Sequence, residues 1–111
     1  MSLLKGTLDV LILKTLSWGP THGYAISRWI GQTTRDELQI EEGALYPALR
    51  RLEERGWVSA TWKRTESGRD AKVYTLTAQG RRHLGTEESV WRRYVTAMTR
   101  VLDARPSGAI G

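Results

Sequence analysis

The side chains of this chain that could do chemistry are mainly arginines, lysines and tyrosines. Three of them, Tyr46, Arg50 and Arg51, lie in one short segment. Arginine can donate paired hydrogen bonds to guanine in a DNA major groove, and arginine and tyrosine can both hold phosphates. Such a pattern also fits an ordinary solvated helix face, since paired arginines are common on surfaces. When such a segment belongs to a helix that a hairpin follows, we expect these three side chains to contact DNA.

A second cationic cluster lies in the polar stretch between two segments of alternating apolar and polar residues. The alternation over 57–63 and 72–76 predicts two strands joined by a loose tip. Cations on such a hairpin can neutralise phosphates, and backbone N–H groups at its tip can add to that contact. An ordinary exposed hairpin is the alternative. The residues that we expect to meet phosphate are Lys63, Arg64, Ser67, Gly68, Arg69 and Lys72.

The sequence contains no recognisable set of catalytic residues. The chain has no cysteine, so cysteine nucleophiles and cysteine metal sites are excluded. His22 and His83 are far apart and lack the neighbours that a metal site needs. Neither a glycine-rich phosphate loop nor a serine–histidine–carboxylate set is present. We therefore expect no catalytic activity, no metal and no cofactor.

Length and charge agree with a single nucleic-acid-binding domain. The 111 residues suffice for one compact domain, and 17 Lys+Arg against 12 Asp+Glu give a net charge of +5. This excess suits a polyanion such as nucleic acid. The start of the chain lacks a signal-peptide pattern, and the longest apolar run, 10–13, is too short to span a bilayer. These features predict a cytoplasmic protein without a membrane partner.

The elements that must position the two clusters follow from apolar periodicity and turn signals. We expect helices over 3–17, over 22–32 with Thr21 as the N-cap, and from 42 or 43 to 55. A short extended piece is expected at 38–40. Pro47 should lie near the first turn of the third helix, and Gly56 should end it.

The third helix has an apolar back and a polar front. Leu45, Leu49 and Leu52 recur at steps of four and three, which places them on one face. Glu53 and Glu54 follow, and we expect these acids to keep the second half of the helix away from the DNA backbone. Helix, helix, helix and hairpin in this order predict a mainly α winged helix-turn-helix domain over residues 1–76.

A last helix is expected from Ala78 to about Asp103, capped by Thr77. Its apolar residues repeat at heptad spacing, which is typical of a helix seam that needs a partner. The first helix is apolar on nearly all sides and also needs cover. We expect a dimerisation helix over 77–104 and a flexible tail over 105–111. The predicted dimer interface contains Leu4, Leu8, Leu84, Trp91, Tyr94, Met98 and Val101.

The tryptophans allow two interpretations. Trp91 could stack a planar or cationic ligand, or it could simply fill the helix seam. The remaining four, Trp18, Trp29, Trp57 and Trp62, are interpreted as packing residues.

Several short motifs, in this order and spacing, resemble the PadR family of bacterial transcriptional regulators. They are Gly6-Thr7-Leu8, His22-Gly23-Tyr24, Gly43-Ala44-Leu45-Tyr46-Pro47, Gly68-Arg69 and Lys72-Val73-Tyr74-Thr75-Leu76-Thr77. The chain is similar to the short branch of the family, which has a single C-terminal helix.

The resemblance implies a homodimer that binds an inverted-repeat operator in double-stranded DNA and usually represses transcription. Some short members of the family also hold a planar aromatic compound at the dimer interface, stacked on a tryptophan that Trp91 matches. Two other functions remain open from the residues alone. One is a winged-helix protein-interaction module without specific DNA binding, and the other is nucleic-acid binding without sequence preference.

Overall fold

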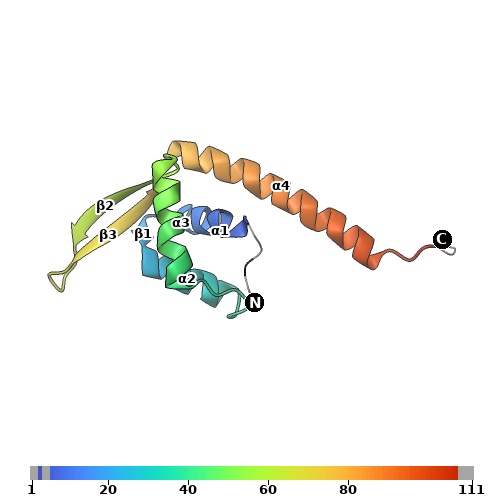
Figure 1. The fold of residues 1–111 in the computed structure, drawn as a ribbon, viewed down its shortest axis with the longest axis horizontal. Helices are drawn as coiled ribbons and strands as arrows, with labels where there is room; N and C mark the ends of the chain where they lie inside the picture. Colours follow the sequence, from blue (N-terminus) through green and yellow to red (C-terminus); the bar gives the residue numbers. More distant parts are fainter. Residues whose placement is uncertain (1–2, 4–5, 108–111) are drawn as a thin grey trace.

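The computed structural model describes residue 3 and residues 6–107, and it shows a winged helix followed by one long helix. Three helices gather around the core, a small sheet extends from one side, and the last helix leaves on the other side as a rod (Figure 1). The principal extents are 68 × 28 × 21 Å. In chain order the elements are α1 (Thr7–Leu16), β1 (Thr21–His22), α2 (Gly23–Thr33), α3 (Glu42–Glu54), β2 (Val58–Arg64), β3 (Asp70–Leu76) and α4 (Ala78–Asp103). The predicted fold class is therefore confirmed.

The core lies where α1, α2 and α3 meet the inner face of the sheet and the start of α4. The leucines at 45, 49 and 52 of α3 are buried, so the predicted apolar back of this helix is confirmed. Leu8 is half-buried and packs against the same core. The core residues with the least exposure are Ile12, Leu13, Leu16, Ile26, Ile30, Leu45, Leu49, Leu52 and Val58.

The first two helices differ from the prediction at their starts. The helix α1 begins at Thr7 rather than residue 3, and Leu3 is not helical. The predicted interface residue Leu4 lies outside the described residues. Thr21, expected to cap α2, instead lies in β1 opposite Tyr74 of β3. A two-residue strand is too short to show alternation, so the sequence indicated a hairpin where the sheet has three strands in the order β1-β3-β2.

The loop before α3 and the position of Pro47 agree with the sequence. Residues 34–41 form the expected loop, and 38–40 pair with no strand. Pro47 is the sixth residue of α3, just after its first turn. A proline there has no N–H for the carbonyl of Gly43. Gly43 is exposed, so solvent can reach the start of the helix, where the carbonyl of Glu41 accepts from two successive N–H groups.

The end of α3 follows the prediction because it depends on one glycine. Gly56 has a φ of 76°, in the left-handed region that a side chain disfavours. The N–H of Gly56 donates to the carbonyl of Glu53, and the N–H of Trp57 donates to that of Leu52, both at 3.0 Å. These two bonds close the helix and direct the chain into β2.

The start of α4 is fixed to the end of α3. As predicted, the Thr77 hydroxyl accepts from the N–H of Gly80 at 2.9 Å, and it also donates to the carbonyl of Gly56 at 2.7 Å. The rings of Trp57 and His83 stack with their centroids 3.6 Å apart. Trp57 is thus a packing residue, as predicted.

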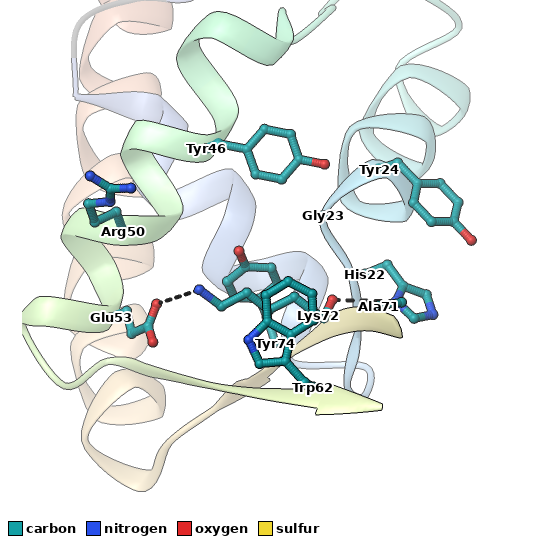
Figure 2. A pocket seen from close by; sticks show the side chains of 10 residues that line it. All are labelled: His22, Gly23, Tyr24, Tyr46, Arg50, Glu53, Trp62, Ala71, Lys72 and Tyr74. Atoms are coloured by element: carbon teal, nitrogen blue, oxygen red, sulfur yellow. Dashed lines mark hydrogen bonds and ion pairs between the residues drawn. The ribbon is translucent and has the colours of Figure 1, made fainter. Parts of the chain in front are cut away.

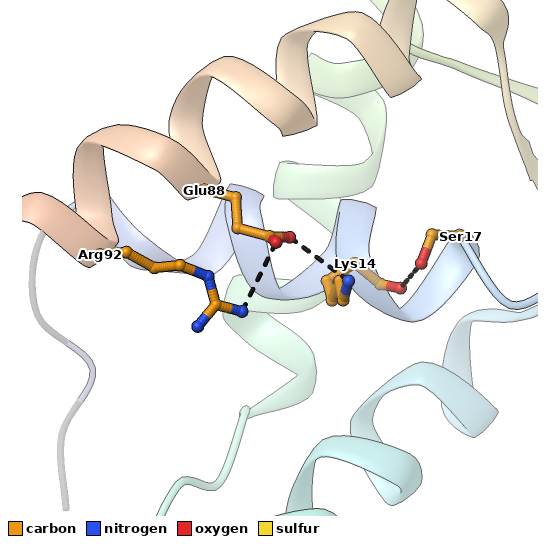
Figure 3. A network of polar contacts seen from close by, with 4 residues as sticks. All are labelled: Lys14, Ser17, Glu88 and Arg92. Carbon is orange, nitrogen blue, oxygen red and sulfur yellow. Dashed lines mark hydrogen bonds and ion pairs between the residues drawn. The ribbon is translucent and has the colours of Figure 1, made fainter.

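Further along, an ion-pair network connects α4 to α1 (Figure 3). The Lys14 Nζ lies 3.3 Å from Glu88 Oε1, and Arg92 reaches the other carboxylate oxygen at 3.5 Å. Hydrogen bonding from Lys14 holds the pKa of the Glu88 carboxyl below its usual value. From Ser89 onward every described residue of α4 is exposed. Only the first part of α4 therefore packs against the rest of the chain.

Candidate nucleic-acid interface

A hollow of about 400 Å³ lies between α3, the start of α2 and the inner side of the wing, the hairpin of β2 and β3 (Figure 2). It gathers side chains that are distant in sequence, from α2, α3 and both wing strands. Its lining residues are His22, Gly23, Tyr24, Tyr46, Arg50, Glu53, Trp62, Ala71, Lys72 and Tyr74. The predicted residues Tyr46, Arg50 and Lys72 are thus brought to one surface.

The upper wall of the hollow is built by Tyr46 and the start of α2. A Cβ placed on Gly23 would lie 2.8 Å from a ring carbon of Tyr46, so only glycine allows the ring this close. Tyr24 projects beside it and stacks on His22, with the centroids 5.5 Å apart. The His22-Gly23-Tyr24 motif therefore makes room for the phenol of α3 and adds an exposed aromatic ring to the same surface.

Arg50 and Arg51 are adjacent in sequence but face different parts of the molecule. Arg50 is exposed, lies one helical turn after Tyr46, and lines the hollow. Arg51 instead forms an ion pair with Asp9 of α1. Successive residues of a helix differ by about 100° in direction. The Arg51 guanidinium thus lies on the side of α1, away from the hollow, and its contact with DNA stays a prediction.

On the wing side, Lys72 of β3 reaches toward α3. Its Nζ lies 3.5 Å from Glu53 Oε2 and 5.6 Å from the centre of the Tyr74 ring. Tyr74 is buried, and burial raises the pKa of its phenol. The charge of Glu53 and the neighbouring Tyr46 raise this pKa further, whereas Arg50 lowers it. These groups therefore influence one another electrostatically across the hollow.

Trp62, Trp18 and Trp29 are exposed, contrary to their interpretation as packing residues. Trp62 is 66% exposed, lies opposite Lys72 in the sheet register, and lines the hollow. Its side chain lies on the same face of β2 as Val58 and Ala60, but further from the core, where the strand becomes exposed. Trp18 is 75% exposed at the turn after α1.

The wing tip carries exposed cations. Lys63, Arg64 and Arg69 are exposed, and Arg64 lies 3.6 Å from Asp70 on the facing strand. The Gly68 N–H donates to the carbonyl of Thr65 at 3.0 Å, and its predicted contact with phosphate stays a prediction. The Ser67 hydroxyl lies 2.9 Å from that of Thr65. The tip is thus a turn closed by its own hydrogen bonds, with exposed cations on both sides of it.

The outer part of α4 exposes a wide apolar face. Trp91 and Tyr94 stack on this face with their ring centres 6.0 Å apart. Leu84, predicted as part of the seam, is only 5% exposed and belongs to the core of its own subunit. Val90, Val95 and Leu102 widen the stripe beyond the heptad positions. The apolar face of α4 consists of Val90, Trp91, Tyr94, Val95, Met98, Val101 and Leu102.

Within residues 6–107, the structure gathers no group of three or more potential metal ligands. No helix in this described part of the chain is long and apolar enough to cross a membrane.

A recognition helix and a wing that share one cationic surface define a winged-helix DNA-binding protein. The family model of the transcriptional regulator PadR-like family matches residues 12–86. The chain therefore belongs to the PadR-like family, whose members are transcriptional regulators rather than enzymes.

Solved structures of regulators share this fold along nearly the whole chain. A transcriptional regulator from Clostridium thermocellum is 27% identical, with a TM-score of 0.79 over 86% of this chain and 90% of that one. A PadR family transcriptional regulator from Eggerthella lenta is 31% identical, with a TM-score of 0.78 over 91% and 86% of the two chains. A PadR-like transcriptional regulator from Bacillus cereus is 26% identical, with a TM-score of 0.79 over 92% and 97%.

Proposed function

We propose that this protein is a homodimeric repressor that binds an inverted-repeat operator in double-stranded DNA. The observation that carries the proposal is the hollow, where Tyr46 and Arg50 of α3 share one surface with Lys72 of the wing. In this arrangement α3 enters the major groove and Arg50 reads a base edge. The wing cations hold the adjacent phosphates and add to the salt dependence of binding.

Dimerisation through α4 gives the two recognition helices a fixed separation. A soluble monomer rarely exposes a continuous apolar stripe as wide as the apolar face of α4. Pairing this face with a second copy buries it and places two α3 helices on one side of the dimer. An operator with half-sites about one helical turn, or roughly 34 Å, apart suits such a pair.

Replacing Arg50 with alanine tests the proposed interface, and Arg51→Ala is the matched control on the same helix. Arg50→Ala removes a base contact and should weaken operator binding by about 1–3 kcal/mol, or roughly 5- to 150-fold. Arg51→Ala should leave affinity nearly unchanged, because Arg51 is paired with Asp9. Gel shifts on the DNA upstream of the gene, with Arg69→Ala as a wing variant, measure these effects.

Three results would contradict the proposed interface. Wild-type affinity in both Arg50→Ala and Arg69→Ala would favour the protein-interaction module. Equal losses on operator and scrambled DNA would favour binding without sequence preference. A larger loss in Arg51→Ala than in Arg50→Ala would show that the wrong face of α3 has been assigned to DNA.

We further propose that a planar aromatic effector binds at the dimer interface against Trp91. The exposed, stacked rings of Trp91 and Tyr94 support this site. A ligand that prefers a different spacing of the two α4 helices relieves repression by its differential affinity for the two forms. Titrating tryptophan fluorescence with planar aromatic cations should give a saturable response that Trp91→Ala removes. An identical response in Trp91→Ala would place the ligand elsewhere.

A further inference from the structure

One acidic side chain lies among the cations of the DNA-facing surface. Among the residues that the structure describes, Glu53 is the only carboxylate that lines the hollow, and its Oε2 lies 3.5 Å from Lys72 Nζ. Figure 2 shows this pair connecting the end of α3 to the wing, below Arg50 and Tyr46. A carboxylate on a surface that meets phosphate opposes binding unless it has a separate role.

We propose that Lys72 exchanges Glu53 for a DNA phosphate only when a duplex fits closely between α3 and the wing. Glu53 thereby suppresses non-specific binding and acts as a specificity-determining residue. The inference rests on the DNA-binding function proposed above.

The Glu53–Lys72 pair is weak enough to exchange. The two side chains are 37% and 35% exposed, and the single contact of 3.5 Å is longer than a good charge-assisted hydrogen bond. Exposed pairs of this kind contribute little to stability, because water screens them and two long side chains must be held in place. A phosphate at direct contact can therefore replace the carboxylate.

Only the side chain of Lys72 has to move. Its backbone is fixed in the sheet opposite Trp62, and its carbonyl lies 3.4 Å from His22 Nδ1. The aliphatic stem of lysine is flexible and allows the ammonium to turn from α3 toward the mouth of the hollow. The exchange thus requires no change in the position of the wing.

The competition between carboxylate and phosphate depends on distance. In a loosely bound, non-specific complex, water separates the phosphates from the protein, and their attraction for Lys72 falls with distance and screening. Glu53 then retains Lys72, which contributes no phosphate contact. In a closely fitted complex the phosphate reaches Lys72 directly, and the contact forms.

Salt-dependent binding separates these two states. The probes are the tightest duplex selected from a randomised library and a scrambled duplex of equal length. On scrambled DNA, Glu53→Gln should steepen the slope of log K against log salt by about 0.9, one phosphate contact, and tighten binding roughly fivefold at low salt. On the selected duplex its slope should stay unchanged. Lys72→Met should have the opposite effect. Its slope of log K against log salt should become shallower by about 0.9 on the selected duplex and stay unchanged on scrambled DNA.

Glu54→Gln is the control, because it removes the same charge from the next residue of α3, which is exposed and does not line the hollow. It should leave both slopes as in wild type. Circular dichroism checks that all variants are folded.

Two outcomes would overturn the proposal. If Glu53→Gln weakens both duplexes and Lys72→Met changes neither slope, the pair is a structural tie between wing and helix. If Glu53→Gln weakens binding to the selected duplex only, Glu53 contacts a base. A wild-type protein that fails to distinguish the two duplexes would instead refute sequence-specific binding itself, which separates the two failures.

Discussion

Replacing Met98 with glutamate should convert the protein to a monomer and lower its operator affinity at least 100-fold. Met98 is 44% exposed at the middle of the apolar face of α4, and it has no role in the core of its own subunit. In a symmetric dimer the substitution would bury two carboxylates without partners, which costs several kcal/mol. A monomer then loses the second half-site contact, which contributes about 10²- to 10⁴-fold in effective affinity.

Thr96→Glu is the matched control for Met98→Glu. Thr96 precedes Met98 by two residues, which corresponds to about 200° around the helix, so it lies on nearly the opposite side. Analytical ultracentrifugation should find a monomer for Met98→Glu and a dimer for Thr96→Glu, and gel shifts should show the parallel loss and retention of binding. A dimeric Met98→Glu variant would mean that the subunits associate through another surface.

The features that could be predicted from the sequence are those that local signals determine. The apolar back of α3 repeats every three or four residues, and the glycine at 56 ends the helix by its own conformation. The alternation of the wing strands and the Thr77 cap are equally local. Together these signals sufficed to place Tyr46 and Arg50 on α3, on the side opposite its apolar back.

The features that could not be predicted depend on partners far away in the chain. Asp9, which engages Arg51, precedes it by 42 residues, and no local pattern connects them. Helical phase could have shown that Arg51 points away from Arg50, but not what it meets. The sequence shows that Glu53 follows the apolar back of α3, but its pairing with Lys72 arises only when the wing folds against α3.

The heptad pattern of α4 could not be divided into core and interface from the sequence, because one apolar stripe contains residues of both kinds. Leu84 lies in the part of the helix that crosses its own core, whereas Met98 lies beyond it. Both residues occupy the same heptad position, because one face of the helix packs first on the core and then, further along, on the predicted partner. The division between core and predicted interface depends on how far the rest of the subunit extends, which periodicity does not encode.

Gly80→Ala should destabilise the subunit by roughly 3 kcal/mol, because α4 crosses the start of β2 at this residue. An added Cβ would lie 2.0 Å from the carbonyl oxygen of Trp57 and 2.8 Å from a methyl of Leu76. That oxygen cannot withdraw easily, since it accepts from the N–H of Thr77 at 3.1 Å. The first turn of α4 must therefore move outward, which would weaken the Thr77 cap and the stack of Trp57 on His83.

The matched control for this clash is Gly85→Ala, five residues later on the same helix, where an added Cβ meets nothing within 4 Å. There alanine should stabilise the protein by up to about 1 kcal/mol, because glycine in a helix interior loses more backbone entropy on folding. Thermal and denaturant unfolding at one fixed protein concentration should thus give shifts of opposite sign. Equal shifts would show that helix propensity governs both sites and that α4 is not packed closely on Trp57.

Since α4 carries the proposed dimer contacts, a displaced first turn should also change the separation of the recognition helices. Gly80→Ala should therefore lose operator affinity even at temperatures where it remains folded.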